Sequence, residues 1–217
     1  MPSKPIHFSQ YGQDALVGDV LFRGRPGIFV DVGARDGVQI SNTVYLEREL
    51  GWTGIAFEPH PDLFKRLAAS RTCRCVNVAV SDEERNSLDF VKFLEEPFGN
   101  SGLLESFPGP ERLANIKHEI ISIPTAPLRT LLQGFDRVDY LDIDVEGHEM
   151  SVLRGIDFSS VEIRIIGVEA GEGSRKAGEV DVFLGQHGFR PFMQVKSDRF
   201  YCFGDALPSS AKLVKLD

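Results

Sequence analysis

Cysteine is scarce in this 217-residue chain, and its three cysteines cannot all pair in disulfides. Cys73 and Cys75 lack the C-x-x-C spacing of redox sites, and three thiols are too few for a structural zinc centre. We therefore expect reduced structural thiols. Long apolar runs are also missing, because no segment approaches the length that spans a bilayer and residues 1–5 lead into no signal-like core. These absences predict a cytoplasmic protein with no membrane partner.

Basic residues are outnumbered as well. The chain has 24 Lys and Arg against 32 Asp and Glu, a net charge of −8, so we expect no nucleic-acid partner. The length suits one well-buried α/β domain and is short for two. Because no repeat or composition shift marks a boundary, we expect a single domain over residues 1–217. It would carry a helical lid segment over residues 1–26 and a tail over residues 204–217.

The stretch IFVDVGARDG, residues 28–37, organises the chain. Its apolar residues suit a buried strand, and Gly33 and Gly37 let the next loop turn tightly and approach a ligand. About one crossover later a second apolar run, residues 54–57, ends in Glu58 and is broken by Pro59. Nucleotide-binding α/β sheets hold ribose hydroxyls with a carboxylate at the tip of the second strand. Together the two stretches predict a nucleoside-containing cofactor.

The rest of the chain alternates between helix and strand patterns. Helices are expected over residues 9–22, 41–50, 61–69, 149–153 and 180–187, and strands over residues 75–80, 88–94, 138–144, 163–169, 190–195 and 200–203. Residues 120–132 suggest a short strand and a short helix. Glu47 is expected on the outward face of its helix, and residues 95–110 are expected to be a substrate-side loop or disordered. This alternation implies an α/β fold with a mainly parallel sheet, an antiparallel end and helices on both faces.

Carboxylates recur where the expected strands end. Ligands of open α/β sheets bind beyond the carboxyl ends of the strands, so these acids should face one crevice: Asp36, Glu58, Asp82, Asp142, Asp144 and Glu169. A single Asp in such a place is more often a cap or turn former, which explains the recurrence less well. Asp142 and Asp144 lie two residues apart, on one face of a strand. With Glu169 they are candidate oxygen ligands for Mg²⁺.

A candidate base follows the acid pair. His148 has a pKa range suited to taking a proton from a hydroxyl at neutral pH, although an exposed position in the first helical turn is an equal alternative. Near the N-terminus, Gln13 is polar enough to reach a ligand, with packing of its helix on the sheet as the alternative.

The loop after the first strand departs from the dinucleotide fingerprint G-x-G-x-x-G, and Asp36 would repel a pyrophosphate. A nucleoside with a cationic or zwitterionic tail suits an acid-lined loop better. S-adenosylmethionine fits this description, with Glu58 on its ribose. An NAD-dependent oxidoreductase is correspondingly disfavoured, whereas a non-catalytic module that keeps the fold and the cofactor pocket stays open.

Several ordered motifs together resemble the S-adenosylmethionine-dependent methyltransferases of the FkbM family. They are SQYGQD (9–14), FVDVGARDG (29–37), SNT (41–43) with LE (46–47), GWTG (51–54) with EP (58–59), AVSD (79–82), and DVEGHE (144–149) with VLRG (152–155). The resemblance runs from Ser9 to about Phe203. It implies a Rossmann-like class I methyltransferase sheet of seven strands, usually O-methylation, and acceptors such as sugar or natural-product hydroxyls.

The motifs also imply roles for site residues. Asp31, Gly33 and Ala34 would shape the cofactor loop, Glu58 would bind ribose, and residues 79–82 would flank adenine. The full expected sets are Gln13, Asp31, Gly33, Ala34, Asp36, Glu58, Pro59, Ala79, Ser81, Asp82 and Asp142 for the cofactor, and Asp144, Glu146 and His148 for catalysis.

Asp142 departs from the pattern of the family, because many relatives have Lys there. The exchange puts an anion beside the reacting centre and strengthens the case for a bound metal. We therefore expect an O-methyltransferase for a small-molecule or glycan acceptor, with Mg²⁺ as a candidate second cofactor. Exposed apolar edge residues would allow a homodimer.

Overall fold

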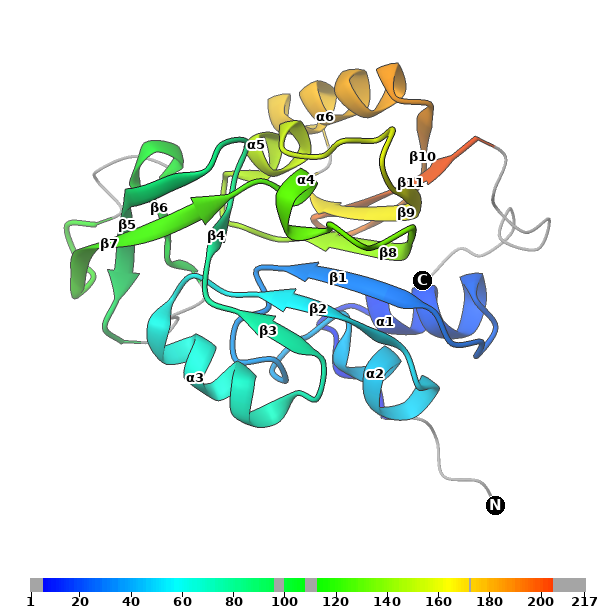
Figure 1. Cartoon of the computed structure of the whole chain (residues 1–217), viewed down its shortest axis with the longest axis horizontal. Coiled ribbons are helices and arrows are strands. Elements are labelled where there is room, and N and C mark those ends of the chain that lie inside the picture. Colours follow the sequence, from blue (N-terminus) through cyan, green and yellow to red (C-terminus); the bar gives the residue numbers. More distant parts are fainter. Residues whose placement is uncertain (1–5, 96–99, 108–112, 172, 205–217) are drawn as a thin grey trace.

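The main sheet has seven strands and runs through the middle of the molecule (Figure 1). The computed structural model describes residues 6–95, 100–107, 113–171 and 173–204. In sheet order the strands are β10 (Phe189–Val195), β11 (Asp198–Phe203), β9 (Glu162–Glu169), β8 (Arg137–Ile143), β1 (Ile28–Val32), β2 (Thr53–Phe57) and β3 (Arg74–Val76). All are parallel except β11, which is antiparallel to both neighbours and lies one place in from the edge. The predicted fold class is confirmed.

Helices cover both faces of this sheet (Figure 1). One face carries α1 (Gln13–Ala15), the π-helix η1 (Leu16–Leu21), α2 (Val44–Leu50) and α3 (Pro61–Ser70), and the other carries α4 (Leu128–Leu131), α5 (Glu149–Arg154) and α6 (Arg175–Gln186). The helix expected over residues 180–187 begins earlier because the Ser174 hydroxyl caps it, accepting a hydrogen bond from the Ala177 amide at 3.0 Å.

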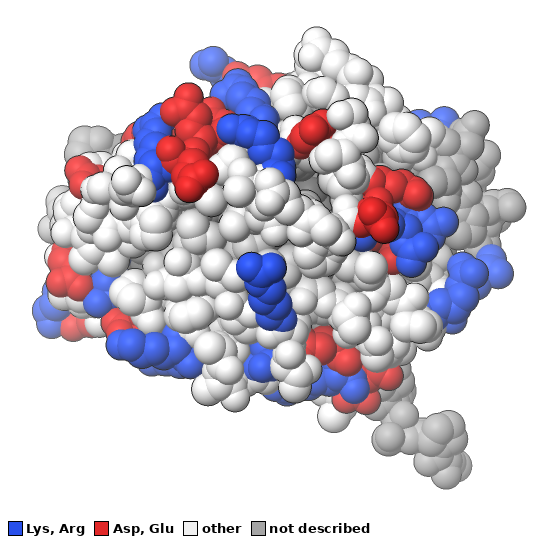
Figure 2. All heavy atoms as spheres, viewed as in Figure 1, with Lys and Arg blue, Asp and Glu red and all other residues white. Residues whose placement is uncertain are grey.

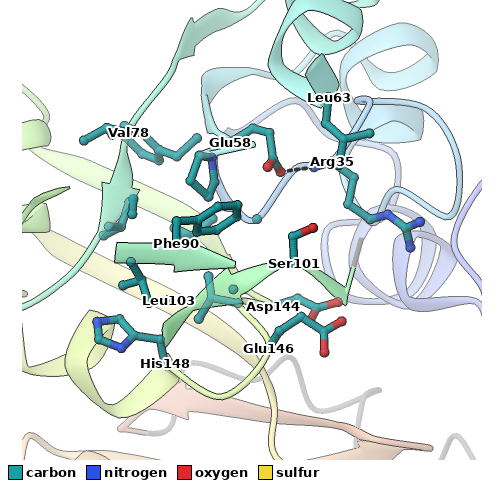
Figure 3. Close-up of a pocket in the computed structure, with 18 residues that line it drawn as sticks. Arg35, Glu58, Leu63, Val78, Phe90, Ser101, Leu103, Asp144, Glu146 and His148 are labelled. Carbon is teal, nitrogen blue, oxygen red and sulfur yellow. Dashed lines mark hydrogen bonds between the residues drawn. The ribbon is translucent and has the colours of Figure 1, made fainter. Parts of the chain in front are cut away.

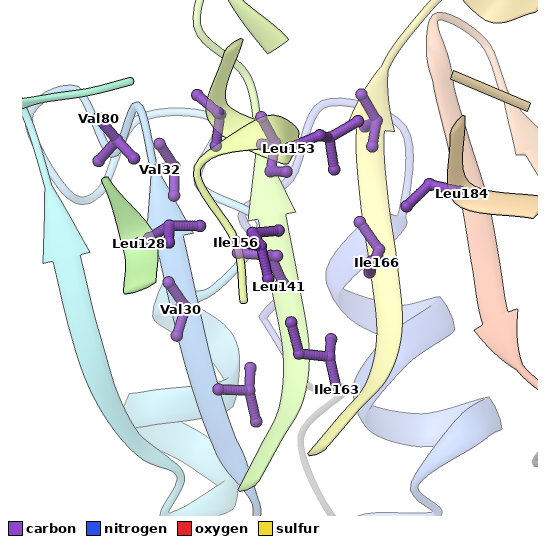
Figure 4. Close-up of a cluster of buried hydrophobic side chains, with 14 of the residues drawn as sticks. Val30, Val32, Val80, Leu128, Leu141, Leu153, Ile156, Ile163, Ile166 and Leu184 are labelled. Carbon is purple, nitrogen blue, oxygen red and sulfur yellow. The ribbon is translucent and has the colours of Figure 1, made fainter. Parts of the chain in front are cut away.

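Alternating side chains of the strands fill two separate cores. Val30, Leu141 and Ile166 face the α4–α6 side and are completely buried (Figure 4). The neighbouring residues Phe29 and Tyr140 point to the opposite side, where they pack with the first helices. Both faces of the central strands are therefore apolar, which explains the nearly continuous apolar runs in the sequence.

A second, four-stranded sheet projects from one end of the first (Figure 1). Its order is β4 (Ala79–Val80), β7 (His118–Ala126), β5 (Arg85–Phe93) and β6 (Gly102–Leu103), and β6 leads into a 3₁₀ turn, η3 (Leu104–Ser106). The single strand expected over residues 75–80 is wrong, because it divides into β3 and β4. Between them the Asn77 side chain donates to the carbonyls of Glu58 at 2.7 Å and Pro59 at 3.1 Å, which turns the chain out of the main sheet.

Some expectations fall on residues outside the described ranges. They are the termini, residues 1–5 and 205–217, and two parts of the expected substrate-side loop, residues 96–99 and 108–110. Across the described segments, no helix combines the length and the apolar character needed to cross a membrane. Figure 2 shows acidic and basic side chains interspersed around the edge of one face, whose centre is made largely of uncharged side chains.

Candidate functional site

A pocket of about 640 Å³, including its open mouth, lies between the two sheets (Figure 3). The carboxyl ends of β1, β2 and β8 supply its polar lining, which includes Glu58, Asp144 and Glu146. The second sheet supplies an apolar wall with Phe90 and Leu103. Sites for small molecules have this size and combine apolar walls with a few polar groups. This pocket, called the larger pocket below, is therefore the candidate site.

A smaller pocket of about 310 Å³, including its open mouth, adjoins the first at the loop that follows β1, residues 33–37, here called the β1 loop. Asp31, Asn42 and Asp142 line it, and it shares Gly33, Arg35 and Asp144 with the larger pocket. The two pockets therefore meet at the β1 loop.

Gly33 makes the close packing at this junction possible. Its amide and that of Ala34 both donate to the Phe57 carbonyl at 3.0 Å, which ties the β1 loop to the end of β2. The φ angle of Gly33 is 97°, and a Cβ added there would lie 1.8 Å from the carbonyl oxygen of Asp144. Only glycine fits both the backbone angle and this contact.

Glu58 is a buried carboxylate at the tip of β2. Its Oε2 accepts a hydrogen bond from the Arg35 amide and its Oε1 from the His60 amide, both at 2.8 Å. Burial raises the pKa of Glu58 to about 8, and the two amide hydrogen bonds oppose that rise. Each carboxylate oxygen keeps a second lone pair, so Glu58 can still accept from hydroxyl groups of a ligand.

Asp142 lies beside another buried acid. Asp31 and Asp142 occupy paired positions on β1 and β8, and both are less than a tenth exposed. Asp142 accepts hydrogen bonds from the Tyr140 hydroxyl at 2.6 Å and from the Asn42 amide at 3.0 Å. Burial and the charge of Asp31 raise the pKa of Asp142 well above its usual range.

Arg71 provides the positive charge that faces the buried acids Glu47 and Asp31. Its guanidinium is fully buried and lies 2.5 Å from Glu47 and 3.9 Å from Asp31. It also donates to the Thr43 hydroxyl at 3.0 Å, and this hydroxyl donates to Asp31. The outward position expected for Glu47 is therefore wrong, since its side chain is 6% exposed and points to Arg71.

The predicted magnesium ligands do not form a metal site. Asp142 is engaged by Tyr140 and Asn42, and Glu169 lies opposite Asp198 on β11, with Lys176 4.0 Å away. Among the described residues, no group of three or more Asp, Glu, His or Cys side chains is arranged to hold a metal ion. The structure thus gives no support to Mg²⁺ as a cofactor.

His148 lines the larger pocket and is buried. The alternative of an exposed position in the first turn of a helix is therefore wrong. His148 is 4% exposed, and its Nε2 lies 2.9 Å from the Ser81 hydroxyl. Its Nδ1 is hydrogen-bonded to the Ser106 hydroxyl. Burial lowers the pKa of His148 below its usual range. With a hydroxyl on each ring nitrogen, His148 is poorly placed to take a proton from a bound acceptor.

Glu146 lies in the lining of the larger pocket and has the better properties of a base. Its φ angle of 54° is unusual for a residue other than glycine, a feature often found at functional sites. Burial, followed by the charges of Glu169 and Glu149, raises the pKa of Glu146 to about 7. General bases work best with a pKa near the operating pH, so Glu146 matches this role near neutrality.

The remaining predicted residues divide between lining and support. Pro59 and Ala79 line the larger pocket and Ala34 the smaller one. Outside both linings lie Gln13, Asp36, Ser81, Asp82 and Glu169. Gln13 donates to Asp198 at 2.5 Å, and Asp36 accepts from two amides of its own turn, at 2.8 and 3.0 Å. The Asp36 carboxylate therefore stabilises the turn that contains it.

Sequence reasoning missed the apolar wall. Phe90 belongs to a strand that alternates like an exposed one, and Leu103 falls in the segment expected to be a loop or disordered. Nothing local in the sequence indicates that these residues meet. Arg35 and Asn42 were also missed. Arg35 lies within the glycine turn and Asn42 just after it, and these positions could have indicated that both residues line a pocket.

The sequence matches the family described as Methyltransferase FkbM domain over residues 31–191. A search of curated proteins gives no match. Among solved structures, methyltransferase FkbM from Methylobacillus flagellatus KT is 14% identical, with a TM-score of 0.45 over 86% of this chain and 48% of that one. The present chain thus spans about half the length of that protein.

Two further solved structures are similarly distant. The TehB-like SAM-dependent methyltransferase from Corynebacterium glutamicum ATCC 13032 Kitasato is 14% identical, with a TM-score of 0.47 over 90% of this chain and 89% of that one. The precorrin-6y C5,15-methyltransferase from Geobacter metallireducens GS-15 is 13% identical, with a TM-score of 0.43 over 87% and 84%. These likenesses are too remote to add to the family match.

Proposed function

Because the chain belongs to the FkbM methyltransferase family, we propose that it uses S-adenosylmethionine to methylate a hydroxyl oxygen of a small-molecule or glycan acceptor. The observation that carries this proposal is Glu58, a buried carboxylate at the tip of β2 in the lining of a pocket with an apolar wall. This is the position from which nucleotide-binding sheets hold ribose hydroxyls. The family match also removes the reason to consider an NAD-dependent oxidoreductase.

The lining suits the parts of S-adenosylmethionine. The wall with Phe90 and Leu103 offers the apolar surface that an adenine ring needs, and Glu58 offers lone pairs to the ribose. Asp142, in the lining of the smaller pocket, offers acceptor oxygens to an ammonium group. When bound, the cofactor supplies an electrophilic methyl group on a positively charged sulfur.

The chain's own contribution to the chemistry is to receive a proton and to orient the acceptor. Glu146 accepts the proton that the acceptor hydroxyl loses, and its pKa of about 7 leaves a large part of the carboxylate free to do so at neutral pH. We assign the orientation of the hydroxyl to Asp144, which lies two residues earlier on the same loop and lines both pockets. Neither role requires a metal ion.

The test is transfer of a labelled methyl group from S-adenosylmethionine to a panel of hexoses, deoxyhexoses and phenols. We expect an O-methylated product, and we expect Glu146→Gln to lower the rate roughly 100-fold while S-adenosylhomocysteine binds as before. Glu162→Gln, an exposed acid at the opposite end of β9, is the matched control and should change neither value.

Two results would count against the proposal. Labelling of nitrogen or carbon instead of oxygen would replace O-methylation with another methyl transfer. Tight binding of S-adenosylhomocysteine with no transfer to any acceptor would favour the non-catalytic module.

A further inference from the structure

The wall of the larger pocket on the side of the second sheet depends on a short segment. Residues 101–106, here called the strap, include β6 and η3 and supply Ser101, Gly102 and Leu103 to the lining. In the sheet the strap is paired only through two positions, Phe90 with Leu103 and Val91 with Gly102. A pairing this short gives little stability on its own. Other contacts must therefore hold the strap against the pocket.

His148, which belongs to the part of the chain that covers the main sheet, provides one such contact to the strap. It precedes α5, and its ring connects Ser81 at the end of β4 with Ser106 at the end of the strap. In Figure 3 the His148 ring lies on the same side of the pocket as Leu103. The ring therefore joins the strap to the body of the protein next to the pocket wall.

The hydrogen bonds around this ring have one consistent direction. When the Ser81 hydroxyl donates to Asp82 at 3.1 Å, it accepts from Nε2 of His148, and we assign the ring proton to Nε2 on this basis. Nδ1 is then an acceptor for the Ser106 hydroxyl. A neutral imidazole satisfies both neighbours at once, which makes the ring a fixed connector.

The backbone is closely packed on both sides of His148. A Cβ on Gly147 would lie 2.9 Å from the Ser106 carbonyl oxygen, and a Cβ on Gly155 would lie 2.2 Å from that of Ser81. The residue before His148 thus touches the strap, and the end of its helix touches the end of β4. His148 lies between two backbone contacts that fix its position.

We propose that His148 is a positioning residue that fastens the strap to the main body through Ser106 and so holds the wall that faces the adenosine part of the cofactor. This inference rests on the proposed function for the identity of the ligand. It gives His148 a role in cofactor affinity and none in proton transfer.

The experiment measures the affinity for S-adenosylhomocysteine by calorimetry in four proteins: the unaltered chain, His148→Ala, Ser106→Ala and the double variant. We expect each single variant to bind about tenfold more weakly, the loss expected for one buried hydrogen bond. The double variant should bind no more weakly than His148→Ala, because both changes remove the same connection. Ser160→Ala, which removes an exposed hydroxyl bonded to the Asp157 carbonyl, is the control and should bind normally.

A second variant separates positioning from catalysis. His148→Gln keeps one donor and one acceptor but cannot take up a proton, so we expect it to restore most of the affinity and to leave kcat within about threefold. A loss of kcat of about 100-fold at unchanged affinity would overturn the proposal and make His148 a base. Wild-type affinity in a folded Ser106→Ala protein would overturn it as well.

Amide hydrogen exchange tests the fastening without any cofactor. We expect the strap amides to exchange about tenfold faster in Ser106→Ala, with unchanged protection in β1 and β8. If the unaltered chain does not bind S-adenosylhomocysteine, the proposed function fails, whereas unchanged exchange in the strap refutes the role of His148.

Discussion

The main sheet and the second sheet contribute chemically different side chains to the pocket between them. The main sheet supplies acidic side chains, because its parallel strands end in loops that carry Glu58, Asp144 and Glu146. The second sheet supplies apolar surface through Phe90 and Leu103. The first contribution follows from a general property of parallel sheets, whose carboxyl ends meet along one edge. The second depends on how β5, β6 and β7 fold back against the main sheet, for which no comparable general rule exists.

The largest expected effect on stability and binding comes from a substitution at Gly33, in the part of the pocket that the main sheet supplies. Gly33→Ala puts a Cβ against the Asp144 carbonyl at 1.8 Å and strains a φ of 97°, so the β1 loop must move. We expect a fall in stability of about 3 kcal/mol and a loss of S-adenosylhomocysteine binding of more than ~100-fold. Thermal melting and calorimetry measure the two effects.

Gly134→Ala is the matched control for this change. Its φ is 90°, yet no atom lies within 4 Å of the added Cβ. It should cost only the strain of the backbone angle, about 1 kcal/mol, and leave binding unchanged. Equal effects of the two substitutions would mean that the contact with Asp144 is unimportant.

Glu58→Ala removes the ribose acceptor from the same side. We expect about 30-fold weaker binding of S-adenosylhomocysteine, from the loss of the hydrogen bonds to the ribose hydroxyls, while adenine alone should lose much less affinity. The comparison of the two ligands by calorimetry checks the assignment. Equal losses for both would show that Glu58 acts only by holding the amides of Arg35 and His60.

Leu103→Ala tests the second-sheet side and should have a smaller effect. Truncating this buried residue removes part of the apolar wall, worth about 1 kcal/mol, so binding should weaken about fivefold. Leu104→Ala, at the exposed neighbouring position outside the pocket lining, should leave the affinity unchanged. A larger loss at Leu103 than at Glu58 would reverse the order of importance of the two sheets.

The smallest expected effect is a gain in stability from Asp142→Asn. The pKa of Asp142 is raised in the folded state above about 3.9, so the folded protein binds this proton more tightly than the unfolded chain. The free energy of unfolding therefore falls as the pH rises from about 4 through the folded-state pKa. Asn cannot ionise next to Asp31, and we expect about 1 kcal/mol more stability at pH ~8 than in the unaltered chain.

Chemical denaturation at several pH values measures this gain. It should shrink as the pH is lowered from the folded-state pKa of Asp142 toward about 4, the usual pKa of Asp, because Asp142 then becomes protonated in the unaltered chain. Asp89→Asn, an exposed acid on the second sheet, should show no such dependence. A destabilised Asp142→Asn protein at high pH would show that the charge of Asp142 is needed for folding.

The sequence predicted the main sheet because its signals are local. Apolar runs, glycine turns and helix caps follow one another at short range, so most of its elements are found close to where they were expected. Of the strand-ending acids that were expected to face one crevice, Glu58, Asp142 and Asp144 line the two adjoining pockets. Asp36, Asp82 and Glu169 lie outside these linings.

The errors concern residues whose partners are far away in the chain. From its position in the helix Glu47 is expected on the surface, but it forms a buried ion pair with Arg71, which lies 24 positions later in the chain. The two ring nitrogens of His148 bond hydroxyls 67 and 42 positions away, Ser81 and Ser106. Periodicity within a helix or a strand carries no information about such contacts, so the buried polar network and the second-sheet wall needed the structure.

We propose that the pocket between the two sheets binds S-adenosylmethionine and that this binding needs no metal ion. Calorimetric titration of the purified protein with S-adenosylhomocysteine, in the presence of either Mg²⁺ or EDTA, tests this proposal. We expect binding to one site with a Kd of ~1–100 μM that is the same in both solutions. The absence of binding in both solutions, or binding that appears only with Mg²⁺, would refute the proposal.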